Sequence, residues 1–322
     1  MNRRQLLALA AAALPLPALA QSNFPNRPVR LVVAFPAGGP TDVVARVVAD
    51  RMVRELGQPV VVENRGGANG NIAADAVAKA DPDGYTMLYN TSSIAISRAL
   101  YRSLAYDLLR DLTPVSLTAA APALLVVNPT LPPRDPAGFV AWARANSGRI
   151  SYSSGGVGNI SHLIAFMVMR HIGAEATHVP YRGTAAALTD VAAGNVQFMA
   201  DALNTALPLA REGRVRPIAV SSAQRAPLLP EVPSMAESGM MPSGFDVGIW
   251  QGIMAPARTP APVLARLNAA VNAALTDAEV RARLAAMGAR PTGGTPKDYA
   301  RYLAQEVALW QRVVAESGAT AE

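Results

Sequence analysis

The stretch from Leu31 to Arg46 constrains the fold of this chain more than any other. Its first five residues, Leu31–Phe35, are apolar and predict a buried strand. Gly38 and Gly39 follow, and Pro40 then opens a run with helical spacing. A strand, a glycine turn and a helix N-terminus leave backbone N–H groups free at the positive end of a helix dipole, where an anion can bind. The same pattern also occurs as a tight turn without a ligand, so both interpretations stay open at this point.

Alternating strands and helices continue through the first part of the chain. The segments 59–63 and 85–89 predict two more strands, with a short alanine-rich helix between them. The second strand ends in the glycine-rich turn 64–71, and the third ends near Thr91 and Ser92. Because such alternation produces a parallel sheet, the turns after these strands are expected to line one crevice.

A second unit of the same design begins near residue 150. The strand 150–154 runs into the glycine turn 155–162, which an apolar helix follows. The segments 177–181 and 196–200 predict two further strands. We therefore expect an α/β fold with two lobes, built on two parallel-rich sheets flanked by helices, whose hinge motion closes a cleft between them.

The order of the segments indicates that one lobe is inserted into the other. A proline-rich connection at 131–136 follows the first lobe, and the strand 216–220 can return the chain to it. We expect residues 21–122 and 226–322 to form the first lobe, and residues 123–225 to form the second.

The first 20 residues have the features of a signal peptide. Arg3 and Arg4 precede the apolar run 6–14, and Ala18-Leu19-Ala20 supplies a cleavage site. The paired arginines resemble a twin-arginine signal, and the general secretory route is the alternative. Because the chain contains no cysteine, it has neither disulfides nor a lipoprotein anchor. Together these features predict a protein exported to the periplasm.

Charge and histidine content exclude several classes of function. The formal net charge is +6, but the basic residues are scattered and aromatic residues make up only 5%, so no nucleic-acid partner is expected. Gly156 and Gly158 imitate a dinucleotide fingerprint that lacks its third glycine, so no cofactor is expected. The three histidines, at 162, 171 and 178, match no metal-binding spacing.

Polar residues beside the glycine turns are candidates for ligand contact, and each also has a structural interpretation. Asp42 lies in the first turn of a predicted helix, where it can simply offset the helix dipole. Asp201 ends an apolar strand. It can be a turn or cap residue, or it can recognise an ammonium or hydroxyl group of a ligand. Arg182 can pair with a carboxylate or point to solvent. His162 can touch a ligand or fix its loop. A catalytic triad can be drawn from Ser153 or Ser154 with His162 and Asp201, but it carries little information because serines are abundant.

Several of these segments together resemble the motifs of a known family. From about Phe24 to the C-terminus, the chain is similar to the receptors of tripartite tricarboxylate transporters, the Bug family. The motifs that carry the resemblance are Pro25–Arg30, Pro36–Asp42, Val62–Gly70, Asp81–Tyr85, Tyr152–Gly158 with Ser161-His162, and Val179–Gly183.

The resemblance implies a two-lobed periplasmic binding fold of the type II-like, Venus-flytrap kind. It also implies a small organic carboxylate held between the lobes by backbone amides, hydroxyls and water, and delivered to membrane transporter subunits by a monomer that is not an enzyme. An exported serine hydrolase and a ligand sensor for a signalling partner are the alternatives. The residues expected to bind the ligand are Pro36, Ala37, Gly38, Gly39, Thr41, Asp42, Thr91, Ser92, Ser153, Ser154, Gly158, His162, Arg182, Gly183, Thr184 and Asp201.

Overall fold

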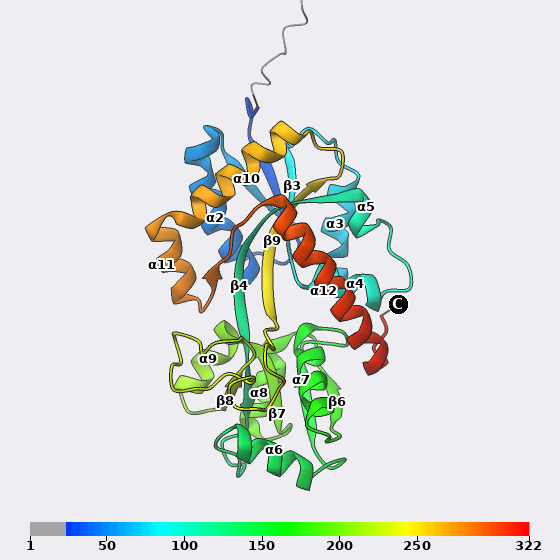
Figure 1. The fold of residues 1–322 in the computed structure, drawn as a ribbon, viewed down its shortest axis with the longest axis vertical. Coiled ribbons are helices and arrows are strands. Elements are labelled where there is room, and N and C mark those ends of the chain that lie inside the picture. The colour runs from blue at the N-terminus through cyan, green and yellow to red at the C-terminus, as the bar shows by residue number, and fades with distance from the viewer. Residues whose placement is uncertain (1–23, 322) are drawn as a thin grey trace, which may run out of the picture.

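The computed structural model describes residues 24–321 and has the expected α/β fold (Figure 1). The predicted signal peptide, residues 1–20, lies outside the described residues. The strands are β1 (Val29–Val33), β2 (Val60–Asn64), β3 (Thr86–Thr91), β4 (Leu112–Val127), β5 (Ser151–Ser154), β6 (Thr177–Pro180), β7 (Phe198–Ala202), β8 (Arg216–Val220), β9 (Gly248–Pro256) and β10 (Arg290–Pro291). The helices are α2 (Pro40–Leu56), α3 (Asn71–Ala78), α4 (Ser93–Leu100), α5 (Leu108–Asp111), α6 (Pro136–Ala145), α7 (Ile160–His171), α8 (Thr184–Ala193), α9 (Leu203–Arg211), α10 (Ala261–Thr276), α11 (Ala278–Ala286) and α12 (Pro296–Ser317).

The strands pair in the order β2-β1-β3-β9-β4-β7-β5-β6, and β8 and β10 also pair with β4. β1 is parallel to β2 and β3, and β5 is parallel to β6 and β7. The central strands β4 and β9 are antiparallel to each other and to their outer neighbours. The two parallel groups expected from the sequence are therefore joined through an antiparallel centre.

The long strand β4 connects the two groups. Residues 112–122 pair with β9, and residues 123–127 pair with β7 and β8. β4 is a single strand of 16 residues, with shifts of register after Pro114. We call the part built on β1–β3, β9 and residues 112–122 the upper lobe, and the part built on β5–β8 and residues 123–127 the lower lobe (Figure 1).

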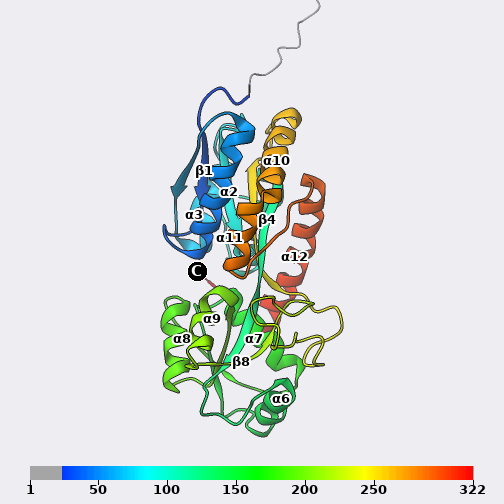
Figure 2. The same ribbon diagram turned by 90° about the vertical axis from the view of Figure 1, so that its left-hand side faces the viewer.

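Strand directions point the functional turns of the two lobes at each other. β4 runs from the upper to the lower lobe, and the pairing through β9 gives β1, β2 and β3 the same direction. β7 is antiparallel to β4, so β5, β6 and β7 run toward the upper lobe. The carboxyl ends of both parallel groups therefore meet at the boundary between the lobes, which Figure 2 shows from the side.

Helix α12 runs from the upper lobe down to α7 of the lower lobe (Figure 1). Its Glu306 is buried and accepts hydrogen bonds from the indole of Trp250 on β9, at 2.7 Å, and from that of Trp310, at 2.9 Å. Burial raises the pKa of Glu306 above its ordinary value. At the far end of the helix, Glu316 pairs with Arg170 of α7 at 2.8 Å. α12 therefore ties the two lobes together on one side of the molecule.

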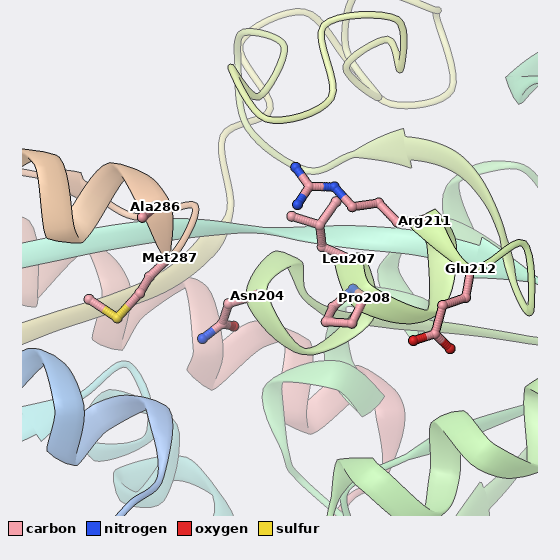
Figure 3. Close-up of a pocket in the computed structure, with 7 residues that line it drawn as sticks. All are labelled: Asn204, Leu207, Pro208, Arg211, Glu212, Ala286 and Met287. Carbon is pink, nitrogen blue, oxygen red and sulfur yellow. The ribbon is translucent and has the colours of Figure 1, made fainter.

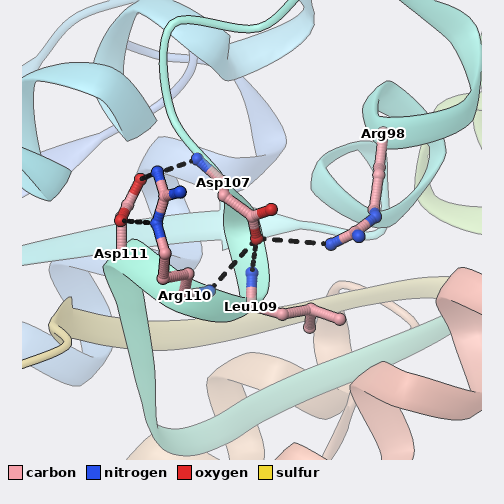
Figure 4. A network of polar contacts seen from close by, with 5 residues as sticks. All are labelled: Arg98, Asp107, Leu109, Arg110 and Asp111. Atoms are coloured by element: carbon pink, nitrogen blue, oxygen red, sulfur yellow. Dashed lines mark hydrogen bonds and ion pairs between the residues drawn. The ribbon is translucent and has the colours of Figure 1, made fainter.

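A surface network fixes the connection between α4 and β4 (Figure 4). The Asp107 carboxylate caps α5 by accepting from the amides of Leu109 and Arg110, at 2.9 and 3.1 Å, and it pairs with Arg98 of α4 at 3.4 Å. Asp111 accepts from the Asp107 amide at 2.8 Å and from the Arg110 side chain. This network holds α4, which borders the lower lobe, against the start of β4.

Candidate functional site

Turns from both lobes meet at the boundary between them. The upper lobe contributes the turns after β1, β2 and β3, and the lower lobe contributes those after β5 and β6. Gly158, in the turn after β5, shows how close the approach is: a Cβ atom added there would lie 2.4 Å from the side chain of Leu100 on α4. The backbone of the lower turn therefore packs directly against the upper lobe.

Asp42 organises the turn between β1 and α2. Its carboxylate accepts hydrogen bonds from the Gly38 amide at 2.9 Å, from Arg46 Nε at 3.0 Å and from Asn64 Nδ2 at 2.8 Å. Only 2% of Asp42 is exposed. Burial opposes ionisation, but these hydrogen bonds outweigh it and hold the pKa of Asp42 below its usual value. Asp42 thus shapes the turn that the sequence identified as a candidate anion site.

These contacts define what the upper turn offers a ligand. The Gly38 amide is engaged by Asp42, so in this conformation Gly38 shapes the turn and its N–H is not directed at a ligand. The Gly39 amide has only a long contact of 3.4 Å with the carbonyl of Pro36. Thr41 is half-buried in the first turn of α2. The exposed residues of the turn are Pro36, Ala37 and Gly38.

The turns after β2 and β3 are bonded to each other. Ala68 and Asn69 have φ angles of 46° and 56°, a left-handed conformation that is strained for residues with a side chain. The Asn69 carbonyl accepts from Ser93 Oγ at 3.1 Å, and Ser93 Oγ in turn accepts from Thr91 Oγ1 at 2.9 Å. Thr91 is buried, as is Ser92, whose amide donates to the backbone of β9. The sequence indicated this turn by its glycines, but not the role of Asn69.

Ser153, Ser154 and His162 of the lower turn are all buried. Ser153 Oγ donates to the backbone of α8. Ser154 Oγ lies 2.6 Å from His178 Nε2 and bonds both the carbonyl and the amide of Gly156, at 3.0 and 3.1 Å. The Gly158 amide donates to His162 Nδ1 at 3.1 Å. These side chains support the turn from behind, and His178 joins them although the sequence gave no sign of that role.

The turn after β6 brings Arg182, Gly183 and Thr184 to the start of α8. Arg182 and Gly183 are exposed, and Gly183 caps the helix with a φ of 107°. Thr184 is half-buried, and its side chain lies near the carboxylate of Asp201 at the end of β7. Burial raises the pKa of Asp201 to about 6, although the hydrogen bond from Thr205 and the nearby Ala202 amide and Thr184 hydroxyl partly oppose the shift.

The catalytic triad considered from the sequence is not assembled. The histidine that contacts Ser154 is His178, whereas His162 bonds a backbone amide. Asp201 bonds Thr205 at 2.6 Å, and within residues 24–321 no carboxylate is hydrogen-bonded to either imidazole. Ser154 is 0% exposed. A buried serine without an oriented base does not form a nucleophilic site.

Two grooves lie away from the predicted residues. One, of about 540 Å³, separates α9 of the lower lobe from α11 of the upper lobe (Figure 3), and the other, of about 400 Å³, lies between α7 and α12. The first is lined by Asn204, Leu207, Pro208, Arg211, Glu212, Ala286 and Met287. Within residues 24–321 there is no cluster of three or more potential metal ligands, and no helix is both long and apolar enough to cross a membrane.

Comparisons with known proteins favour a receptor over a hydrolase. The family model described as "Tripartite tricarboxylate transporter family receptor" matches residues 44–319. The chain belongs to this family. The receptor interpretation is therefore supported over the hydrolase, because the family is one of solute-binding receptors.

Individual relatives cover almost the whole chain. The protein BugT of Bordetella pertussis is 37% identical over 99% of each chain, and a protein of Agrobacterium vitis is 36% identical over 99% of this chain and 92% of its own. Among solved structures, R. palustris Rpa4515 with adipate has a TM-score of 0.81 and 38% identity, covering 92% of this chain and 99% of that one. MatC from Rhodopseudomonas palustris with bound malate has a TM-score of 0.77 and 37% identity, covering 90% and 100%. The periplasmic binding protein BugD has a TM-score of 0.78 and 35% identity, covering 93% and 100%.

Proposed function

We propose that this chain is a periplasmic receptor that captures a small organic carboxylate between the upper and lower turns and delivers it to the membrane subunits of a tripartite transporter. The observation that carries the proposal is the convergence of two helix N-termini, those of α2 and α8, on the boundary between the lobes. The solved relatives that hold adipate and malate support a carboxylate as the ligand.

The ligand's carboxylate is held by groups that the turn network leaves available. We assign this role to the first-turn amides of α2 and α8, beginning with Gly39 and Gly183, and to the hydroxyls of Thr41 and Thr184. In this arrangement Asp42, Ser153, Ser154 and His162 keep the turns in shape, and Pro36, Ala37, Gly158, Thr91 and Ser92 form the walls.

Asp201 restricts which other functional groups the ligand can have. A carboxylate buried beside Thr184 repels a second anion when it is ionised, so it favours a ligand with a hydroxyl or ammonium donor, or a carboxyl that shares a proton with it. Arg182, which is exposed beside the same turn, then pairs with an ionised carboxylate.

Capture requires the lobes to move relative to each other. We propose that residues 21–122 with 226–322 move as one unit and residues 123–225 as the other, with β4 passing from one unit to the other between residues 122 and 123. The chain acts as a monomer, makes and breaks no bond, and reaches the periplasm by its N-terminal segment, residues 1–20.

A thermal-unfolding scan tests the proposal. The purified protein, shown to be free of bound ligand, is heated with malate, adipate and related acids, and with the amides of the same acids. An acid present at about 100 times its dissociation constant stabilises the native state by about 2.7 kcal/mol. We expect one acid to raise the unfolding midpoint and its amide to leave it unchanged. Hydrolysis of the amides, or no shift with any acid, contradicts the proposal.

Two matched variants test the assigned contacts. Thr184→Val removes the hydroxyl next to Asp201, and Thr189→Val removes one on the exposed side of the same helix. We expect Thr184→Val to weaken binding of the stabilising acid by about tenfold, which corresponds to one hydrogen bond to a charged group, and Thr189→Val to leave it unchanged. Equal affinities of the two variants contradict the assignment.

A further inference from the structure

We propose that His178 is a positioning residue of the lower turn: its imidazole, stacked on that of His162, holds residues 154–158 in the shape that receives the ligand. The proposal rests on the proposed function, because it takes this turn to be part of the ligand site. His178 itself lies on β6, behind the turn, and is not among the residues expected to contact the ligand.

The two imidazoles form an unusually close stack. Their ring centroids are 3.7 Å apart and their planes differ by 4°. Tyr152 lies on the same stack, 5.1 Å from His178 and 6.0 Å from His162, with planes inclined by 24° and 21°. Tyr152 and His178 are neighbours in the parallel pairing of β5 with β6. The sheet therefore sets the position of His178, and His178 in turn covers the face of His162.

Hydrogen bonds determine where His178 carries its proton. Ser154 Oγ donates its single proton to the Gly156 carbonyl and accepts from the Gly156 amide. The remaining partner, His178 Nε2 at 2.6 Å, then acts as the donor to the second lone pair of the hydroxyl. With this tautomer all three hydrogen bonds of the buried Ser154 hydroxyl are satisfied, and both the N–H and the carbonyl of Gly156 are held by the same hydroxyl.

The second imidazole is neutral for a related reason. His162 Nδ1 accepts from the Gly158 amide at 3.1 Å, so this nitrogen carries no proton. Protonation of His162 at Nδ1 would break that bond, and protonation of His178 would place a cation against the neighbouring ring. Burial lowers the pKa of both histidines, that of His162 to about 4 with a contribution from His178.

The surroundings of the stack offer no compensating charge. The groups packed against it are Tyr152 on β5, Ser154 at the end of that strand, Phe198 on β7 beside Tyr152, and the turn amides. Within residues 24–321 no aspartate or glutamate lies within ion-pair distance of either imidazole. Acid is therefore expected to loosen the lower turn and to weaken ligand binding.

Paired substitutions separate the hydrogen bond from the ring. His178→Gln keeps an N–H donor in place of Nε2, whereas His178→Phe keeps an aromatic ring and removes the donor. His171→Gln, on the exposed end of α7, is the control. Calorimetric titration with malate and with adipate is expected to show binding weakened by about tenfold in His178→Phe, by less than about threefold in His178→Gln, and unchanged in the control.

Two measurements without ligand keep the proposal testable on its own. In NMR spectra of the wild-type protein, we expect the His162 and His178 rings to titrate well below the ordinary imidazole value, and the Gly156 and Gly158 amides to exchange faster in His178→Phe than in His178→Gln. If neither acid binds the wild type, the proposed function fails for these ligands and the two NMR measurements still decide the role of His178.

Three results would overturn the positioning role. The first is titration of both rings at the ordinary imidazole value. The second is glycine amide exchange that is the same in both His178 variants. The third is His178→Phe that binds the acid as tightly as the wild type.

Discussion

The upper turn after β1 and the lower turn after β5 have the same sequence design but are held by opposite kinds of chemistry. In the upper turn the buried carboxylate of Asp42 gathers an amide, an arginine and an asparagine, and the Arg46 side chain of this network is 49% exposed. In the lower turn two stacked, neutral imidazoles, of the buried His162 and the half-buried His178, are joined by the buried hydroxyl of Ser154. A strand–glycine–helix pattern therefore predicts where a binding turn lies, and not what supports it.

The two supports should respond differently to pH. The lowered pKa of Asp42 means that its contribution is present above the ordinary aspartate value and is lost as pH falls through the lower native value. The histidine stack contributes fully above the ordinary imidazole value and is lost as pH falls toward about 4, where His162 protonates. Mild acid should therefore loosen the lower turn while the upper turn stays intact.

The largest effect is expected from Asp42→Ala. It removes the charged acceptor of the hydrogen bonds from the Gly38 amide and the Asn64 side chain, and hydrogen bonds to charged groups contribute about 1.5–3 kcal/mol each. We expect a loss of about 3–5 kcal/mol in the free energy of unfolding, measured by urea titration, and no detectable binding of the acid. Asp50→Ala, on the exposed face of the same helix, is the control. If Asp42→Ala binds the acid as tightly as the wild type, the Asp42 carboxylate does not shape the upper turn for binding.

Gly158→Ala should cause the next largest loss of stability. It combines backbone strain with a steric clash between the two lobes. The φ of Gly158 is 70° and its Cβ would meet Leu100, whereas Gly38 and Gly173 have φ of 77° and 68° with nothing within 4 Å. Left-handed strain alone amounts to about 1–2 kcal/mol, and the clash adds about 1–2 more.

A double-mutant cycle isolates the contact of Gly158 with Leu100. Gly38→Ala and Gly173→Ala report the strain, and Leu100→Ala combined with Gly158→Ala should recover the additional loss in urea unfolding. If the three glycine variants lose the same free energy of unfolding, with no coupling to Leu100, the lower turn does not pack against the upper lobe.

Asp201→Asn should change the pH dependence of stability by a smaller amount. The native pKa of Asp201, about 6, lies above its ordinary value of 3.8, so its contribution is present in acid and is lost as pH rises through about 6. The variant should therefore gain about 1–2 kcal/mol relative to the wild type between about pH 5 and pH 7.5. Asp190→Asn, at a half-buried carboxylate with a lowered pKa, should show no change over this interval. If the difference in stability between Asp201→Asn and the wild type does not change with pH, the Asp201 carboxylate is not buried in solution.

The smallest effect is expected from Arg46→Ala. The guanidinium is half exposed, and exposed ion pairs contribute about 0–1 kcal/mol. We expect a loss below about 1 kcal/mol that shrinks at high salt, measured by urea unfolding at two ionic strengths. A loss as large as that of Asp42→Ala would mean that the upper turn depends on this charge pair and not on the amide bonds.

The sequence predicted the α/β alternation, both glycine turns and the family, since apolar runs, glycines and whole-chain motifs are read directly from the residues. It did not reveal the support of the lower turn, because the stacking of His178 on His162 follows from the parallel register of Tyr152 with His178, which has no sequence signal. It also predicted that the Gly38 amide contacts the ligand, but it did not reveal that this amide is hydrogen-bonded to the Asp42 carboxylate. The spacing of Gly38 and Asp42, four residues apart, was the available hint.

The most direct test is NMR of protein labelled with ¹⁵N in its 24 glycines, titrated with the acid that raises the unfolding midpoint. If one carboxylate is held between the two turns, signals of Gly38 and Gly39 in the upper turn should shift together with those of Gly156 and Gly183 in the lower lobe. All of these signals should have the same midpoint. Shifts confined to one lobe, or shifts in the two lobes with different midpoints, would contradict capture between the lobes.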